Sequence, residues 1–546
     1  MINRKWLIAV LTGVVVVGSA FNYAYKDKLY EISKNIEIFI NVYKELNANY
    51  VDDIDPTQLM SVGLDAMVGS LDPYTNYISE SEVTSYRIST DGKYQGIGAI
   101  VSKIDDYVTI VEPYADSPVL EVGLKAGDQI IAIEGMSTKG KTRDEVTQIY
   151  RGVPGTNVNL TIQRPGESLP FDVDLVREEV DIPNVPYSGW VDPDVAYVSL
   201  TTFTMGASKN IRQAIRNMRN ENPNMKGIIL DLRYNGGGLL AEAIKVSNIF
   251  IPKGQEVVSV KSKVRERDVS YSTQDLPVTD DMPLVVLINK NSASASEIVS
   301  GTIQDYDRGV LMGQRSYGKG LVQNTTQVGY QSQVKLTTSK YYIPSGRCIQ
   351  SVEYKDGEPV DIPDSKRAKF KTKGGRTVLD GGGVSPDVFL KPIEKSDYLK
   401  ALEQSHIIFK FVTDYMQSAE YQDTLLEEVV FEDYEDFKAY VRNTRFDFES
   451  SQEKLLKNLQ SDLDDQYDDT IKKDLESLVS KISSYDDRAI EIYKEDIIDR
   501  IELEIATRLR FQEGKIYQSL EDDSEIVEAV SLLKDNDRYN QILRPQ

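Results

Sequence analysis

The central part of the chain alternates apolar strands with helices, and small residues occupy the turns between them. One apolar run leads into Asn235-Gly236-Gly237-Gly238 and a helical pattern that ends near Phe250. A second leads into a serine-rich turn and a helical pattern that ends near Tyr306. Such βα units predict a buried, largely parallel α/β core over residues 181–395. Its strands are predicted at residues 227–232, 283–289, 310–312 and 321–326.

Residues 92–180 consist instead of short stretches rich in β-branched residues, bounded by Gly, Pro and Asp. Two features are specific: the loop Gly96-Ile97-Gly98-Ala99 before a strand, and the segment Gly123-Leu124-Lys125-Ala126-Gly127-Asp128. With five or six strands and two helices, this unit resembles a PDZ domain. Consecutive N–H groups in such a loop can bind a free carboxylate while the next strand edge pairs with a peptide. A plain glycine turn is the alternative.

The first 25 residues have the pattern of an export signal. Arg4 and Lys5 precede an apolar run over residues 6–21. The run fits a signal peptide cut after Ala20 or an uncleaved membrane anchor, and both alternatives stay open. Basic residues before such a run hold that end in the cytoplasm, so we expect the remainder to be extracytoplasmic. Residues 26–91 follow as a predicted helical region, a cap or a dimerisation arm, with a turn at Leu71-Asp72-Pro73-Tyr74.

Histidine and cysteine occur once each, as His406 and Cys348. One histidine cannot build a two-histidine metal site, and one cysteine cannot form an intrachain disulfide. His406 lies in a polar segment far from any glycine-rich turn. A hydrolase with this sequence therefore needs a lysine or a carboxylate as its general base.

The net charge of −23 is concentrated at the end of the chain, where 36 acidic and 18 basic residues follow from Ala401 onward. A strongly acidic protein repels phosphate backbones, which disfavours nucleic acid as a partner. Residues 396–546 have helical spacing and are rich in tyrosine. We interpret them as a structural or partner-binding extension without chemistry of its own.

The segment Asn291-Ser292-Ala293-Ser294-Ala295-Ser296-Glu297 stands where a buried strand turns into a helix. Small residues allow a sharp turn, and the N-terminus of the helix directs N–H groups and positive potential at it. A serine in this turn is exposed beside amides that can bind an oxyanion. The alternative is that these serines are ordinary helix caps.

A lysine between two glycines precedes the last predicted strand, in Tyr317-Gly318-Lys319-Gly320-Leu321-Val322-Gln323. Burial of the amine favours its neutral form, which would let Lys319 accept a proton from a serine. A phosphate-binding loop is the alternative, but the spacing of a Walker motif and its Ser/Thr are absent.

Together these segments resemble the carboxyl-terminal processing proteases, membrane-associated or secreted Ser/Lys endopeptidases with an inserted PDZ domain. The resemblance covers roughly residues 42–390 and implies a core of the crotonase and Clp-protease ββα type, with helical N- and C-terminal extensions. The matching stretches are Asp231-Leu232-Arg233-Tyr234-Asn235-Gly236-Gly237-Gly238, Ser292 to Ile298, Ser316 to Gln323, Leu71-Asp72-Pro73-Tyr74 and Gly382-Gly383-Val384-Ser385-Pro386-Asp387.

Carried over to this sequence, the resemblance implies that Ser294 is the nucleophile, Lys319 the general base and Gln323 the residue that orients the lysine. The oxyanion hole would consist of the amides of Ala295 and of either Gly237 or Gly238. Glu297 and Asp305 also match family positions, and we interpret them as supporting groups.

The sequence therefore predicts an exported serine endopeptidase of the bacterial cell envelope, on the periplasmic or extracytoplasmic side of the inner membrane. Its expected partners are protein substrates with free apolar C-termini, the membrane if the N-terminal segment stays uncleaved, and a second copy of the chain. No metal or organic cofactor is implied. The alternatives are a catalytically silent PDZ scaffold that binds C-termini and a crotonase-like enzyme that acts on a thioester, which would leave the PDZ unit and Lys319 unexplained.

Overall fold

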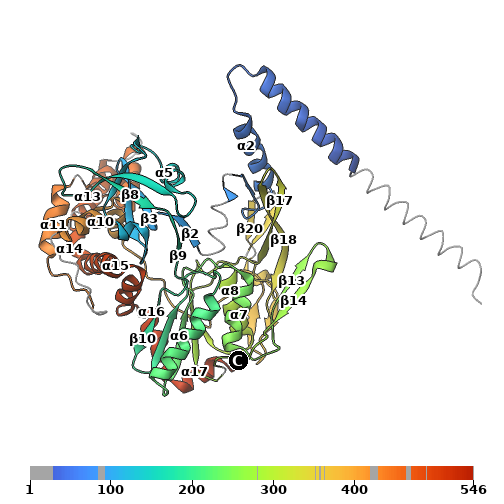
Figure 1. Cartoon of the computed structure of the whole chain (residues 1–546). Coiled ribbons are helices and arrows are strands. Elements are labelled where there is room, and N and C mark those ends of the chain that lie inside the picture. Colours follow the sequence, from blue (N-terminus) through green and yellow to red (C-terminus); the bar gives the residue numbers. More distant parts are fainter. Residues whose placement is uncertain are drawn as a thin grey trace, which may run out of the picture.

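The computed structural model describes residues 29–80, 82–83, 93–279, 281–350, 352–355, 358–361, 363–417, 428–444, 446–462, 469–486 and 488–544. The predicted export signal over residues 1–25 lies outside the described residues. Among the helices in the described ranges, none combines the length and the apolar character needed to cross a membrane. Figure 1 shows N-terminal helices, a PDZ-like unit, an α/β core and a set of C-terminal helices.

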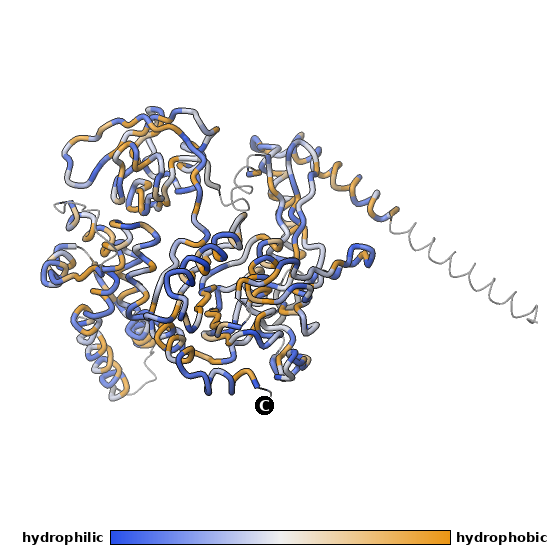
Figure 2. The backbone as a smooth tube through the Cα atoms, turned by 60° about the horizontal axis from the view of Figure 1, so that its bottom comes forward, coloured by the Kyte–Doolittle hydropathy of each residue, from blue (hydrophilic) through white to orange (hydrophobic). Residues whose placement is uncertain are grey.

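The N-terminal region contains a helix over residues 29–49, helix α2 (Pro56–Gly69) and strand β1 (Asn76–Ile78). The helical prediction is wrong for β1, which pairs antiparallel with the later strand β18 (Ser332–Tyr342). The helical pattern ends because the Asp72 carboxylate accepts the N–H groups of Tyr74 and Thr75 and turns the chain. Figure 2 shows apolar residues distributed along the projecting first helix, where Ile36 and Phe39 are exposed.

The PDZ-like unit is a small sheet in the strand order β3-β4-β5-β7-β8, with β6 paired to β5 and a separate β2–β9 pair. Apolar side chains from these strands and from helix α5 form its core. Strand β3 lies at one edge of the sheet, and α5 packs beside it. The elements are β2 (Lys93–Gly96), β3 (Ala99–Ile104), β4 (Tyr107–Pro113), α4 (Pro118–Glu121), β5 (Gln129–Ile133), β6 (Met136–Ser137), α5 (Arg143–Tyr150), β7 (Asn157–Gln163), β8 (Phe171–Val176) and β9 (Glu178–Asp181).

The α/β core is a six-stranded sheet in the order β10-β11-β12-β15-β16-β23. All neighbouring pairs are parallel except β10 with β11, which confirms the predicted parallel core for the strands predicted at 227–232, 283–289 and 310–312. The prediction is wrong for residues 321–326, which lie in a second sheet and pair antiparallel there. Its elements are β10 (Tyr187–Asp192), β11 (Val195–Ser199), α6 (Ala207–Glu221), β12 (Gly227–Asp231), α7 (Leu240–Phe250), β15 (Leu284–Ile288), α8 (Ala295–Asp305), β16 (Val310–Gly313) and β23 (Val388–Phe389).

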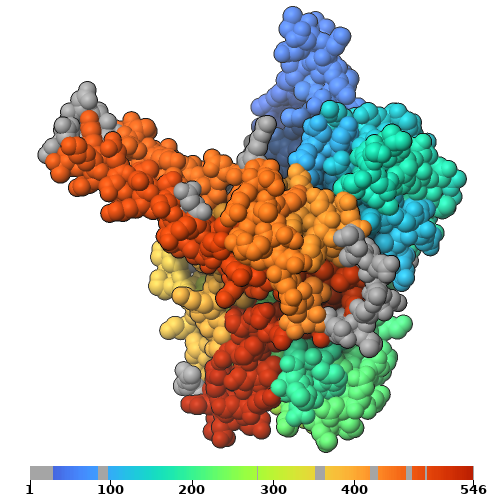
Figure 3. Space-filling view, turned by 90° about the vertical axis from the view of Figure 1, so that its left-hand side faces the viewer, coloured from blue at the N-terminus to red at the C-terminus, as the bar shows by residue number. Residues whose placement is uncertain are grey.

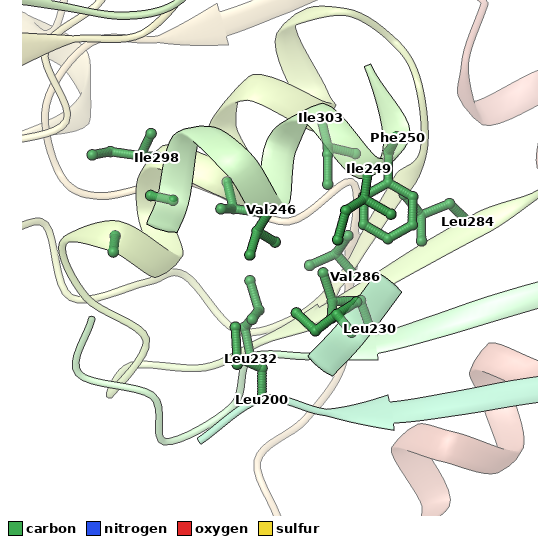
Figure 4. Packing of buried hydrophobic residues seen from close by; sticks show 14 of the residues in the cluster. Leu200, Leu230, Leu232, Val246, Ile249, Phe250, Leu284, Val286, Ile298 and Ile303 are labelled. Atoms are coloured by element: carbon green, nitrogen blue, oxygen red, sulfur yellow. The ribbon is translucent and has the colours of Figure 1, made fainter. Parts of the chain in front are cut away.

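Helices α6, α7 and α8 cover one face of this sheet. Figure 4 shows Val246 and Ile249 of α7 and Ile298 and Ile303 of α8 packed over the strands. Burial of such a side chain contributes about 1.5–3 kcal/mol relative to exposure. The packing therefore fixes where α8 begins, and with it the serine turn at its N-terminus.

A second sheet carries the lysine segment. Its order is β1-β18-β13-β14, with β17 paired to β18, and Lys319 lies just before β17. The strands are β13 (Glu256–Ser262), β14 (Val269–Ser272), β17 (Leu321–Gly329) and β18 (Ser332–Tyr342). Two small hairpins follow, formed by β19 (Val352–Lys355) with β20 (Glu358–Asp361) and by β21 (Lys369–Lys371) with β22 (Thr377–Leu379).

The C-terminal helices do two different things. The first of them form a helical core of their own, and α15 also packs against β4 of the PDZ-like unit. The last two, α16 and α17, cover the second face of the core sheet. The helices are α9 (Asp397–Gln404), α10 (Ile407–Tyr415), α11 (Tyr434–Asn443), α12 (Ser451–Asp462), α13 (Asp469–Asp486), α14 (Ala489–Ile492), α15 (Lys494–Leu520), α16 (Ser524–Lys534) and α17 (Asn536–Ile542). Figure 3 shows these helices in contact with both the PDZ-like unit and the core.

Candidate active site

Ser294 occupies the turn between β15 and α8 in an unusual backbone conformation. Its φ is 56° and its ψ is −112°, outside the extended conformation of an ordinary N-cap. The flanking serines are buried and hold the turn, because Ser292 Oγ donates to the Leu232 carbonyl and Ser296 Oγ to the Asn235 carbonyl, each over 2.8 Å. Of the three serines in this turn, Ser294 alone is partly exposed.

The glycine turn after β12 lies directly against Ser294. The φ of Gly237 is 101°, and a Cβ atom there would lie 2.8 Å from Ser294 Cβ and 2.9 Å from the Ala295 nitrogen. Both features require glycine. The buried Asn235 fixes this contact, because its carbonyl accepts the Ala293 N–H over 3.0 Å.

Two of the three amides predicted to bind an oxyanion remain available. The Gly237 N–H donates to Asn235 Oδ1 over 2.9 Å. Within the described ranges, the N–H groups of Gly238 and Ala295 donate no hydrogen bond. The geometry therefore distinguishes Gly238 from Gly237, which the sequence left as alternatives.

Lys319 is partly buried between two conformationally demanding glycines. The φ of Gly318 is 89°, and a Cβ atom on Gly320 would lie 2.6 Å from the Gln350 nitrogen. Burial lowers the pKa of Lys319 from its ordinary value of 10.5, and the charge of Lys335 acts in the same direction. The charges of Glu297 and Asp72 oppose this shift. The Lys319 side-chain nitrogen, Nζ, lies 4.5 Å from the centre of the Tyr74 ring.

Glu297 joins the serine turn to the lysine segment. Its fully buried carboxylate accepts the backbone N–H of Ser294 and that of Lys319, both over 2.8 Å. It also accepts the Gly318 N–H and the Ser316 hydroxyl, both over 2.6 Å. The four donors lower the pKa of Glu297, but the effect of burial is larger, and the net pKa is raised to about 7.

Tyr341 makes a second connection between the same two segments. Its buried hydroxyl donates to the carbonyl of Lys319 and lies 3.2 Å from that of Ser294. Sequence reasoning missed this residue because it stands on β18, a strand that was not predicted. A hydroxyl that contacts both carbonyls helps to fix the position of the lysine segment relative to the serine turn.

The Gln323 side chain is hydrogen-bonded to Thr337 and not to the Lys319 amine. Its side-chain amide donates to Thr337 Oγ1 over 3.1 Å, and Thr337 Oγ1 in turn donates to the Asp72 carboxylate over 3.2 Å. In the part of the chain that the structure describes, no hydrogen bond joins the Lys319 amine to Ser294 or Gln323. Asp72 and Tyr74 both belong to the segment Leu71-Asp72-Pro73-Tyr74, whose proximity to the lysine the sequence did not indicate.

The loop Gly96–Ala99 of the PDZ-like unit is buried and precedes the edge strand β3. The φ of Gly98 is 83°, and its Cα packs against Ser117 so closely that a Cβ atom would lie 2.5 Å from Ser117 Cβ. The N–H groups of Ile97 and Gly98 form no hydrogen bond with any described residue. Buried backbone donors are nearly always paired, so these two groups indicate a place for an acceptor that lies outside the described residues.

The remaining predicted groups lie elsewhere. Asp305, at the end of α8, pairs with the buried Arg347 over 3.0 Å. His406 is the N-cap residue of α10 in the C-terminal helices. Among the described residues, no cluster of three or more His, Cys, Asp or Glu side chains could hold a metal ion.

Three family models match the chain. The model described as peptidase family S41 matches residues 194–358, a PDZ domain model matches residues 95–175, and a model described as the C-terminal helical domain of a probable PDZ-protease matches residues 398–533.

Curated relatives match more than half of this chain. A carboxy-terminal-processing protease from Bartonella bacilliformis is 36% identical over 321 residues, which cover 58% of this chain and 73% of the relative. A probable CtpA-like serine protease from Staphylococcus aureus is 33% identical over 370 residues, covering 66% of this chain and 73% of the relative.

Solved structures match over parts of the chain. A photosystem II D1 C-terminal processing protease is 24% identical with a TM-score of 0.35, covering 65% of this chain and 92% of that one. The PDZ domain of a carboxy-terminal protease from Vibrio cholerae, solved in complex with a peptide, is 31% identical with a TM-score of 0.16, covering 16% of this chain and 99% of that one.

Proposed function

Because the chain belongs to the S41 family of carboxy-terminal-processing serine proteases, we propose that it cleaves protein substrates with Ser294 as nucleophile and Lys319 as general base. The observation that carries this assignment is the buried Glu297 carboxylate, which binds the backbone of both residues. It fixes the partly exposed serine and the partly buried lysine relative to each other without any histidine.

In the proposed reaction, the neutral amine of Lys319 accepts the hydroxyl proton of Ser294 as Ser294 Oγ attacks the scissile carbonyl. The Gly238 and Ala295 N–H groups, which are unpaired among the described residues, stabilise the oxyanion of the tetrahedral intermediate. The protonated lysine then donates its proton to the leaving amine, and water hydrolyses the acyl-enzyme by the same steps. Gln323, whose side-chain nitrogen donates to Thr337, would orient the amine through its amide oxygen.

The pH dependence of turnover tests the protonation state of this base. Burial lowers the pKa of Lys319 below 10.5, and only the deprotonated amine can accept the serine proton. We expect kcat/KM to rise with pH through the Lys319 pKa and to level off above it, measured between about pH 6 and pH 10. A rate that falls steadily over this range, in an enzyme that stays folded, would exclude a lysine base.

The PDZ-like unit is proposed to bind the substrate's C-terminus. The substrate would pair as a strand with the outer edge of β3, between β3 and α5, with its terminal carboxylate at the Ile97 and Gly98 N–H groups. The buried apolar core beside this loop favours an apolar terminal residue. The support is the buried, unpaired pair of amides, since these two form no hydrogen bond within the described chain.

Amidation of the substrate tests this role. A peptide amide cannot supply the charged acceptor, so we expect its kcat/KM to fall by about 10- to 100-fold against the matched free acid. The measurement is cleavage of the two peptides by the wild-type chain, with their binding to Ser294→Ala as the control. Equal cleavage and equal binding of the two forms would show that the PDZ-like unit does not recognise the terminal carboxylate of the substrate.

Export is a further part of the proposal. The basic and apolar pattern of residues 1–25 supports passage through the inner membrane of a bacterium, with the protease in the periplasm or otherwise outside the cytoplasm. The exposed apolar side chains on residues 29–49 support membrane association or self-association of that segment. We expect a C-terminally tagged chain to be digested by protease added to spheroplasts. A fully protected, cytoplasmic chain would contradict export.

A further inference from the structure

The glycine turn that carries Gly238 is tied to the far end of the sequence. Arg233, which begins this turn, extends its guanidinium to the start of α16. One of its terminal nitrogens lies 2.7 Å from an Asp523 carboxylate oxygen and 2.6 Å from a Glu525 carboxylate oxygen. The side chains of Arg233 and Glu525 are only 11% and 6% exposed, so these ion pairs are screened little by water or salt.

The acidic groups around Arg233 also accept hydrogen bonds from donors of the core. Arg233 also forms hydrogen bonds of 2.7–3.1 Å to both Asp231 oxygens, and Asp231 accepts the Tyr197 hydroxyl over 2.8 Å. The second Glu525 oxygen accepts the Gln314 amide over 2.5 Å. A buried polar network in which each acid has its donor favours one geometry over its alternatives.

This network lies at the carboxyl ends of the core strands, where the candidate active site also lies. Arg233 follows β12, and Gln314 follows β16. The strand between them, β15, leads to Ser294. The N-terminus of α16 thus meets the carboxyl ends of the strands that carry the oxyanion turn and the nucleophile.

From Arg233 the contacts continue to the amides of the turn. The Tyr234 N–H donates to Asn289 Oδ1 over 3.0 Å, and Asn235 binds Gly237 and the Ala293 N–H. Arg233 is the residue of this turn that reaches the C-terminal helices. We infer that Asp523 and Glu525 are positioning residues, which act through Arg233 to place the Gly238 amide at the oxyanion. This inference rests on the proposed function of Ser294 and its oxyanion hole.

The same helix offers a matched control at its other end. Lys534, at the end of α16, pairs with Asp192 of β10, far along the sheet from the glycine turn. This pair also attaches α16 to the core, but it has no connection to the oxyanion amides. Because the Lys534 side chain is 48% exposed and that of Arg233 only 11%, thermal stability is compared along with kcat, which separates a loss of docking from a loss of catalysis.

The test compares the double variant Asp523→Asn/Glu525→Gln with Lys534→Met in the full-length chain. Asparagine keeps the N-cap of α16, which Asp523 now provides, and glutamine keeps the shape of Glu525. The assays are kcat and KM on a free-acid peptide, and affinity for a peptide boronate, whose adduct with Ser294 places an oxygen in the oxyanion hole. Thermal unfolding is recorded in parallel, and Glu525→Gln alone replaces the double variant if the latter does not fold.

We expect kcat of the double variant to fall between about 10- and 100-fold, KM to stay within about twofold, and boronate affinity to fall in proportion to kcat. Lys534→Met should keep the wild-type kcat and boronate affinity. The inference is overturned if the acidic variants lose thermal stability only, or if Lys534→Met loses as much activity. A wild-type chain that forms no boronate adduct at Ser294 would instead contradict the proposed function itself.

Discussion

Replacing Lys319 with arginine should abolish peptide cleavage although the charge is kept. A guanidinium stays protonated at every pH at which the protein is folded, so it cannot accept the proton of Ser294. Lys319→Met removes the base while keeping the length of the side chain. For both variants we expect kcat to fall by about 10³-fold or more, measured on a peptide with a free C-terminus.

The control for this pair is a lysine on the neighbouring strand. Lys340 of β18 is exposed and is not part of the proposed chemistry, so Lys340→Met should cleave at the wild-type rate. Binding of the C-terminal peptide and the thermal midpoint should be unchanged in all three variants, which separates chemistry from folding. A Lys319→Arg variant with a near-normal rate would eliminate lysine as the base.

Placing a charge at Leu533 should unfold the protease core. Leu533, on the buried side of α16, is 2% exposed, and its side chain packs on the backbone of Gly227 in β12. Truncating a buried leucine costs about 2–5 kcal/mol, and a buried, unpaired carboxylate adds a further penalty. Because domains are stable by only about 5–15 kcal/mol, Leu533→Asp should leave little folded protein.

Val527 provides the comparison on the same helix, because its side chain is 58% exposed. Val527→Asp should leave the thermal midpoint and the soluble yield close to those of the wild type. Both variants are measured by thermal unfolding of the full-length chain. If Leu533→Asp were as stable as Val527→Asp, α16 would not be an integral layer of the core.

The elements that were predicted correctly are those whose pattern is local. The strands β12 and β15 are apolar on both faces. The turns of small residues that follow them indicate where the next helices begin. Strands of the PDZ-like unit such as β5 and β7 were recognisable for the same reason, as short stretches rich in β-branched residues. The family resemblance then connected the Ser294 turn with Lys319, which no local pattern could have done.

The elements that were missed depend on distant partners. Strand β18 is rich in polar residues because much of the β17–β18 hairpin is exposed, so it lacks the apolar alternation of a half-buried strand. The helical spacing of α16 was visible, but its partner β12 lies about 300 residues earlier, and periodicity does not identify the surface that a helix covers. Glu297 was predicted only as a supporting group, through the family resemblance, and its contacts with Gly318 and Lys319 arise only from the packing of two sheets.

The central claim is that Ser294 attacks the substrate in a serine protease that works without histidine. It is tested most directly by cleavage of a protein with a free apolar C-terminus by the wild-type chain and by Ser294→Ala, with mass analysis of the quenched wild-type enzyme. We expect the wild type to cleave and to show an acyl adduct on the peptide that contains Ser294, and Ser294→Ala to bind the same C-terminus without cleaving. Cleavage by Ser294→Ala at the wild-type rate, or binding without cleavage by the wild type, would contradict this assignment.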